Sequence, residues 1–257
     1  MKPSSVVAIA LAAIVASTGA GSAADLPCAS GRPEARLTEH LPHTAARVHG
    51  GGDLTIVALG SSSTAGYGAS SRQNTYPSRL AAELRERWPR LHIEVLNKGI
   101  GGETDNDMMR RFEKDVLPYK PDLVIWQLGT NALLKEDGVT RDAPRIMAGI
   151  ERLKRSGADV IPMNPQYAPK VLKDPDHGEM VEMLDEVAVA EHVAMFDRFT
   201  VMREWVSTGA AEFETILSAD GLHMNDASYR CMARLLADSI VTAASPPLVA
   251  ATPAAAR

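Results

Sequence analysis

The chain has 257 residues, of which 45% are hydrophobic and 23% are charged, and its formal net charge is −5. This length and hydrophobic content suit one α/β domain with a sizeable core. A mildly acidic chain lacks the basic surface that nucleic acid or anionic lipid requires, so we expect neither as a partner.

The first 24 residues have the pattern of a secretory signal peptide. Lys2 lies in a short polar start, residues 6–16 are almost purely apolar, and small residues follow as far as Ala24. A permanent membrane helix takes roughly 20 apolar residues, so this run is too short to be one. We therefore expect residues 1–24 to be cleaved on export to the periplasm or the medium, and we expect no stable membrane anchor. The alternative is a buried N-terminal helix.

Three further parts follow the predicted signal peptide. Residues 25–52, rich in Pro, Gly and His, are expected to form an arm over the surface. Residues 53–244 form the predicted domain, and residues 245–257, rich in Ala and Pro, form a predicted disordered tail. Cys28 and Cys231 permit one disulfide in an oxidising compartment, although they could also be two unrelated buried thiols.

Apolar strand patterns alternate with helical patterns along the domain. A continuous apolar run at residues 54–59 predicts a strand buried on both faces, and apolar-rich segments predict three more strands at residues 92–96, 122–128 and 158–161 and a shorter fifth at residues 193–196. Apolar residues at helical spacing predict helices at residues 75–88, 104–117, 141–156, 178–192 and 225–242. The alternation predicts a three-layer α/β/α fold with a mostly parallel five-stranded sheet. In such a sheet, ligands bind beyond the carboxyl ends of the strands.

The loop after the first predicted strand is a run of small residues, beginning with Gly60, Ser61, Ser62 and Ser63. Such a run allows a sharp turn and leaves a hydroxyl exposed at the sheet edge, where a nucleophilic serine is useful. A plain Ser/Gly turn or a helix cap explains the same residues. A phosphate-binding loop is a weaker alternative, because the lysine of the P-loop pattern is missing.

The loops after the second and third predicted strands carry two more candidate residues. Gly102 precedes Glu103 and a predicted helix, so exposed backbone N–H groups at this turn suit an anionic oxygen. Asn131 follows the third strand and offers a side-chain N–H donor at the same edge. Taken singly, each is also explained by a tight turn.

An acidic residue and a histidine, Asp220 and His223, come just before the last predicted helix. An aspartate at this spacing can accept a hydrogen bond from histidine Nδ1–H and leave Nε2 free as a base. Asp174 and His177 have the same spacing and are a competing pair. Because His177 opens a predicted helix, a capping or surface role is the ordinary interpretation for it.

Together these segments resemble the SGNH (GDSL) hydrolase family, named for its Ser, Gly, Asn and His residues. The resemblance runs from about residue 54 to residue 240. The family's G-D-S-L block reads Gly60-Ser61-Ser62-Ser63, its second block matches Gly102-Glu103-Thr104, its G-x-N-D block reads Gly129-Thr130-Asn131-Ala132, and its D-x-x-H block is matched by Asp220 and His223.

Two residues depart from the family pattern. Ser61 and Ala132 stand where the family usually has aspartate. Neither position forms or breaks bonds in the family's general scheme, so we expect effects on loop support and on the substrate-facing surface. Ser61 and Ser63 are minor rivals of Ser62 as nucleophile.

The resemblance implies a flavodoxin-like SGNH hydrolase fold and a serine esterase that needs no cofactor and no metal. Ser62 would be the nucleophile, His223 its base and Asp220 the residue that orients the base. The oxyanion would be bound by the backbone N–H groups of Ser62 and Gly102 and by the Asn131 side chain.

The expected substrate is a small-molecule or polysaccharide ester, such as an O-acetyl or short acyl group on a carbohydrate. Gln166 and Tyr167, in the loop after the fourth strand, are candidate substrate contacts, although a polar connecting loop explains them equally well. Other functions on this scaffold are an O-acyltransferase, a carbohydrate-active enzyme that uses Asp220 and Glu103 as acid and base, and a non-catalytic polysaccharide-binding module.

Overall fold

The structure is a computed structural model that describes Cys28, residues 32–135 and residues 142–245. The predicted signal peptide and all but Ser245 of the predicted tail lie outside this part of the chain. Across the described residues, none of the helices combines the length and the apolar character needed to cross a membrane.

A parallel four-stranded sheet forms the centre of the domain, with strand order β2-β1-β3-β4. The strands are β1 (Asp53–Gly60), β2 (His92–Gly99), β3 (Leu123–Gln127) and β4 (Asp159–Met163). Every residue of β3 and β4 is buried, as expected for strands covered on both faces.

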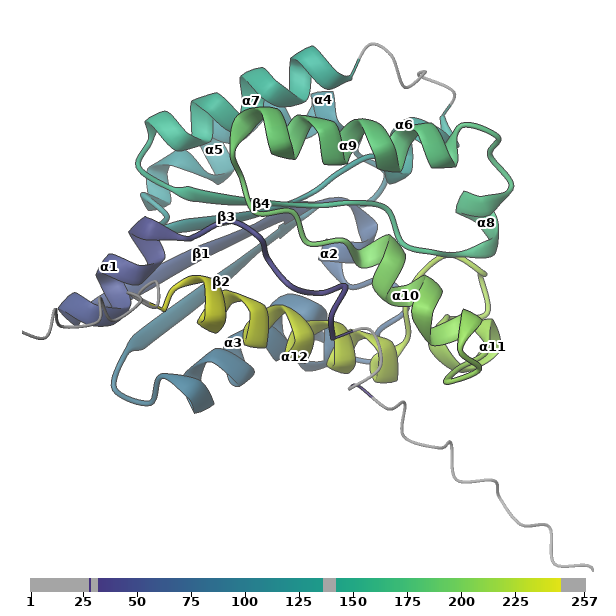
Figure 1. The fold of residues 1–257 in the computed structure, drawn as a ribbon, viewed down its shortest axis with the longest axis horizontal. Coiled ribbons are helices and arrows are strands. Elements are labelled where there is room, and N and C mark those ends of the chain that lie inside the picture. The colour runs from purple at the N-terminus through teal and green to yellow at the C-terminus, as the bar shows by residue number, and fades with distance from the viewer. Residues whose placement is uncertain (1–27, 29–31, 136–141, 246–257) are drawn as a thin grey trace, which may run out of the picture.

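Helices cover both faces of this sheet, which confirms the predicted three-layer α/β/α fold (Figure 1). One layer contains α3 (Tyr76–Arg87) and α12 (Asp226–Ala243), which pack against each other. The opposite layer contains α4 (Asp105–Arg110), α5 (Phe112–Asp115), α7 (Ala143–Arg155) and α9 (His177–Glu191). The helix predicted over residues 104–117 is thus divided, with Arg111 between its two parts.

The predicted fifth strand is reduced to a single bridge, so the five-stranded sheet is corrected to four strands. Of residues 193–196, only Phe196 pairs with the sheet, through a parallel bridge to Met163. The segment ends there because Asp197 caps helix α10 (Arg198–Ser207) immediately afterwards. The helix begins too soon after Phe196 for the pairing with β4 to continue beyond this one bridge.

A helix and a disulfide tie the N-terminal arm to the domain. The arm contains helix α1 (Pro42–Gly50), whose first turn is bound by the carboxylate of Asp159 in β4 through the Thr44 backbone and hydroxyl at 2.7 and 2.8 Å. A disulfide joins Cys28 to Cys231 in α12, across 203 residues of sequence. The arm is therefore bound both to β4 and to α12.

The remaining elements are short. Four helices and two 3₁₀ turns make up this group: α2 (Ser62–Ala65), α6 (Thr130–Leu134), α8 (Pro169–Leu172), α11 (Phe213–Ile216), η1 (Arg72–Asn74) and η2 (Leu117–Tyr119). Two of them, α2 and α6, begin directly after the carboxyl ends of β1 and β3, and so place their side chains at one edge of the sheet.

Candidate active site

Ser62, His223 and Asp220 form a continuous hydrogen-bonded chain at the carboxyl edge of the sheet. The Oγ atom of Ser62 lies 2.7 Å from Nε2 of His223. On the other side of the imidazole, Nδ1 lies 2.5 Å from Oδ2 of Asp220. This order of hydroxyl, imidazole and carboxylate is the arrangement that lets a serine attack a carbonyl.

Glycines shape the turn that presents Ser62. A Cβ atom on Gly60, the last residue of β1, would lie 2.0 Å from Oγ1 of Thr64, so only glycine fits there. Gly66 closes α2 with a φ of +101°, a conformation that favours glycine. The sharp strand-to-helix turn leaves Ser62 as the first residue of α2.

The pKa of Asp220 is held well below its usual range. Partial burial acts in the opposite direction, but hydrogen bonds outweigh it. The carboxylate accepts from the His223 side chain and backbone, from the Leu222 backbone and from the Ser218 hydroxyl. Asp220 therefore stays ionised at neutral pH and can fix the orientation of the His223 ring.

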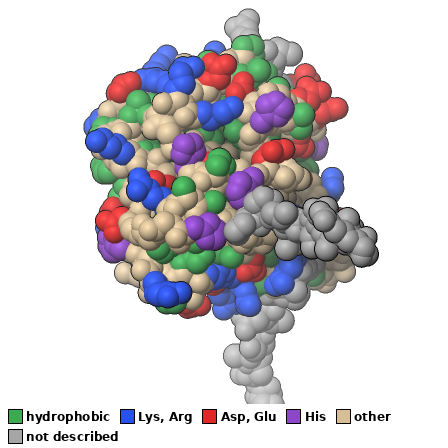
Figure 2. All heavy atoms as spheres, turned by 60° about the vertical axis from the view of Figure 1, so that its left-hand side comes forward, with side chains coloured by type: hydrophobic (Ala, Val, Ile, Leu, Met, Phe, Trp, Pro, Cys, Tyr) green, Lys and Arg blue, Asp and Glu red, His purple; other side chains and the backbone are tan. Residues whose placement is uncertain are grey.

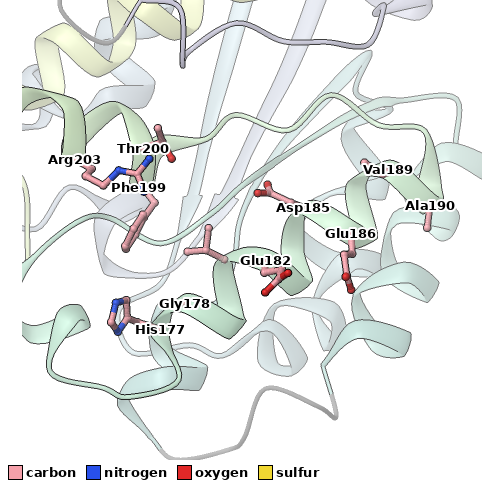
Figure 3. Close-up of a pocket in the computed structure, with 11 residues that line it drawn as sticks. His177, Gly178, Glu182, Asp185, Glu186, Val189, Ala190, Phe199, Thr200 and Arg203 are labelled. Atoms are coloured by element: carbon pink, nitrogen blue, oxygen red, sulfur yellow. The ribbon is translucent and has the colours of Figure 1, made fainter.

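The competing pair does not form the same arrangement. The Nδ1 atom of His177 lies 2.6 Å from the backbone oxygen of Asp174, not from its carboxylate. The His177 ring stacks on Phe199 and lines a cavity of about 740 Å³ along α9 and α10 (Figure 3). Neither Ser62 nor His223 lines this cavity.

Neither rival serine is hydrogen-bonded to His223 in the described part of the chain. Ser61 is buried, and its hydroxyl is hydrogen-bonded to the carboxamide of Gln127. Ser63 is also buried, and its backbone oxygen accepts a hydrogen bond from Tyr229. Among the described serines, Ser62 alone has a hydroxyl bonded to the imidazole.

Gly102 and Asn131 lie close together at the same edge of the sheet, where β2 and β3 end. The Asn131 side chain donates to the backbone oxygen of Glu103 at 2.8 Å, which leaves its amide a second N–H. Gly102 has a φ of +81°, and Lys135 binds its backbone oxygen at 2.6 Å. Within the described residues, no group accepts a hydrogen bond from the backbone N–H of Ser62 or of Gly102.

Gln166 and Tyr167 are both engaged with neighbouring residues of the protein. Gln166 is buried; it accepts from the Thr130 hydroxyl and donates to the backbone oxygen of Leu222. The Gln166 amide thus joins α6 to the loop that carries His223, and its contact with substrate stays a prediction. Tyr167 packs its ring against Phe199 and Phe213.

Arg111 supports the site and is among the residues that the sequence interpretation missed. Its guanidinium binds the carboxylates of Glu103 and Asp115 and the backbone oxygens of Gly60 and Lys98. It thereby links the ends of β1 and β2 to the Gly102 loop. The available signal was an arginine in the middle of a predicted amphipathic helix.

Histidines also gather at the opposite end of the sheet. His40, His43 and His192 line a cavity of about 280 Å³ near α1. Figure 2 shows the face toward α1, where histidines lie among intermixed acidic and basic side chains. In the described part of the chain, no group of three or more His, Cys, Asp or Glu residues is arranged to hold a metal ion.

Known proteins resemble this chain in sequence and in fold. A model of the Non-GDSL lipase-like family matches residues 27–246. An acetylxylan esterase from Geobacillus stearothermophilus is 38% identical over 61 residues, which cover 24% of this chain and 28% of that protein. An arylesterase from Vibrio mimicus is 29% identical over 119 residues, which cover 44% of this chain and 56% of that protein.

Among solved structures, a two-domain esterase active on acetylated mannans superposes with a TM-score of 0.71 at 20% identity. The match covers 85% of this chain and 58% of that chain. At this identity the likeness shows the fold. The chain spans between about a quarter and just over half of the length of these three proteins.

Proposed function

The chain belongs to the Non-GDSL lipase-like family and has the fold of SGNH hydrolases, and we propose that it is a serine esterase. It would hydrolyse a carboxylic ester through a covalent acyl-enzyme on Ser62. One observation carries the proposal: Ser62 Oγ lies 2.7 Å from His223 Nε2, and Asp220 binds the other nitrogen of the same ring.

The first half of the reaction forms the acyl-enzyme. Ser62 Oγ attacks the ester carbonyl while its proton passes to Nε2 of His223. Asp220 stabilises the imidazolium that results. When the tetrahedral intermediate collapses, the bond to the alcohol oxygen breaks and His223 returns the proton to the departing alcohol.

In the second half, His223 takes a proton from water, and the resulting hydroxide attacks the acyl carbon. The acid then leaves as Ser62 regains its proton.

The oxyanion would be stabilised by the backbone N–H groups of Ser62 and Gly102 and by the side chain of Asn131. The support is that both backbone N–H groups lack an acceptor in the described residues and that Asn131 keeps a spare N–H beside them. Preorganised donors of this kind stabilise charge that develops in the transition state; removing one typically costs about 10²–10³ in turnover.

We propose carbohydrate O-acetyl esters as the substrate class. The relatives named above include an acetylxylan esterase and an esterase active on acetylated mannans, which supports this choice.

We further propose that the protein is exported. The signal-peptide pattern of residues 1–24 and the Cys28–Cys231 disulfide, a bond typical of oxidising compartments, both support export.

The test is hydrolysis of p-nitrophenyl acetate by the wild type and by Ser62→Ala and His223→Ala. We expect each substitution to lower kcat by about 10³ or more, because nucleophile and base act as a unit. His177→Ala is the matched control, since this histidine has the same spacing to an aspartate but does not contact Ser62; it should keep wild-type activity. Undiminished activity in Ser62→Ala would contradict the mechanism.

A further inference from the structure

Tyr67 exposes its ring next to the proposed base. Tyr67 is 57% exposed, the largest exposed fraction among the described Phe, Tyr and Trp residues. The ring centroid lies 5.5 Å from that of His223, with the two planes tilted by 39°. An aromatic face left open at this place contributes nothing to the core.

The backbone of Tyr67 is tied to the nucleophile segment and to α12. Its N–H donates to the backbone oxygen of Ser62 at 3.0 Å, and its backbone oxygen accepts from the Tyr229 hydroxyl at 2.7 Å. The next residue, Gly68, has a φ of +84°, and a Cβ there would lie 2.3 Å from the backbone oxygen of Met224. The turn that carries the exposed ring is therefore fixed relative to Ser62.

The other end of the ring reaches the loop of the proposed oxyanion glycine. A Cβ atom added to Gly101 would lie 3.1 Å from the Tyr67 hydroxyl oxygen. Gly101 directly precedes Gly102. Tyr67 therefore extends from His223 to the loop that contains Gly102.

We infer that Tyr67 is a substrate-binding residue that receives the sugar ring of a carbohydrate ester, an inference that rests on the proposed function. A pyranose ring has an apolar face of C–H groups and a polar rim. A fixed tyrosine offers a matching flat apolar surface and a hydroxyl at its edge. Because the turn is already rigid, little conformational freedom is lost when the sugar binds.

The test compares kcat/KM for acetylated xylobiose with kcat/KM for ethyl acetate, an ester with no sugar ring. We expect Tyr67→Ala to lower the ratio of the two values about three- to tenfold, the size of one aromatic contact. Tyr67→Phe keeps the ring and should retain most of the ratio. Tyr119→Ala is the matched control, because Tyr119 is 41% exposed but contacts Lys98 instead of the site.

Each outcome decides the inference. If Tyr67→Ala keeps both activities and leaves the ratio unchanged, the role of Tyr67 is overturned but the proposed function is not. An equal fall on both esters would likewise overturn it, since that result indicates a structural role in the nucleophile turn. A wild-type protein inactive on both esters would instead contradict the proposed function, and this inference with it.

Discussion

The carboxamide of Gln127 binds both the backbone and the hydroxyl of Ser61. Its Oε1 atom accepts from the Ser61 N–H at 3.0 Å, and its Nε2 atom lies 3.0 Å from the Ser61 hydroxyl. The same Oε1 accepts from the Thr64 hydroxyl at 3.1 Å. Gln127, the last residue of β3, thus holds the turn on both sides of Ser62. One of its partners, Ser61, stands at the position where SGNH hydrolases usually have aspartate.

Replacing this amide should loosen the nucleophile. In Gln127→Leu the buried N–H of Ser61 loses its acceptor, which typically costs about 1–3 kcal/mol of stability. We expect kcat on p-nitrophenyl acetate to fall roughly tenfold with little change in KM, because a misplaced nucleophile affects the chemical step more than binding. Urea unfolding and steady-state kinetics measure the two effects.

Ser61→Ala is the matched control for Gln127→Leu. It removes the hydroxyl but keeps the backbone N–H bonded to Gln127, so both effects should be smaller. If the two variants were equally stable and equally active, the backbone hydrogen bond would not be what positions Ser62.

Arg111 should matter to stability and to the oxyanion site together. In Arg111→Met, the half-buried carboxylates of Glu103 and Asp115 lose their shared cation, and two backbone oxygens lose a donor. We expect a loss of roughly 2–4 kcal/mol in the free energy of unfolding, with reduced kcat. The neighbouring Arg110→Met is the control: that side chain is 72% exposed and, within the described residues, forms an ion pair with Asp107. Equal effects from the two variants would contradict this assignment.

The strands β1, β3 and β4 could be predicted because burial on both faces leaves a direct sequence signal. The edge strand β2 is mostly unburied, and its shorter segment with Ile93, Val95 and Leu96 also became a strand. Helix α10 was missed because its pattern is not clearly amphipathic: Arg198, a charged residue, is fully buried on the side that also carries Phe199 and Trp205. Helix α1 depends on Asp159, a contact 115 residues distant that local sequence does not encode.

The candidate site shows the same division. The sequence identifies the four family residues because each follows a recognisable strand end or precedes a helix: Ser62, Gly102, Asn131 and His223. It does not identify the side chains that support them. Gln127 ends an apolar run like any strand residue, and its hydrogen bonds to Ser61 arise only when β3 pairs beside β1.

The Cys28–Cys231 disulfide should stabilise the folded protein. A disulfide typically contributes about 2–4 kcal/mol by restricting the unfolded chain, and the contribution grows with the length of the closed loop; here the cysteines are 203 residues apart. We expect the double variant Cys28→Ser/Cys231→Ser to unfold at lower urea concentration than the oxidised wild type. Adding reductant should lower the midpoint of the wild type and leave the double variant unchanged. A wild-type midpoint insensitive to full reduction would contradict the prediction.

A buried carboxyl behind the Asn131 segment should make stability depend on pH. Burial raises the pKa of Asp105 to about 7, opposed by the hydrogen bond from the Gly129 N–H, while the charge of Asp142 raises it further and Arg145 lowers it. The folded protein therefore holds a proton, between about pH 4 and pH 7, that the unfolded chain has lost. Because the folded state binds more protons, the free energy of unfolding should fall as the pH rises through this window.

Asp105→Asn removes this titration and can keep the acceptor for Gly129. The variant should match the wild type near pH 4 and exceed its stability at pH 8, by at most about 4 kcal/mol. Asp107→Asn on the same helix is the control. Hydrogen bonds from the Thr104 backbone and hydroxyl lower the pKa of Asp107, so its contribution is constant above pH 5 and declines only in acid. Urea unfolding at pH 5 and at pH 8 separates the two, and a stability difference between wild type and Asp105→Asn that does not change between these pH values would show that Asp105 ionises normally.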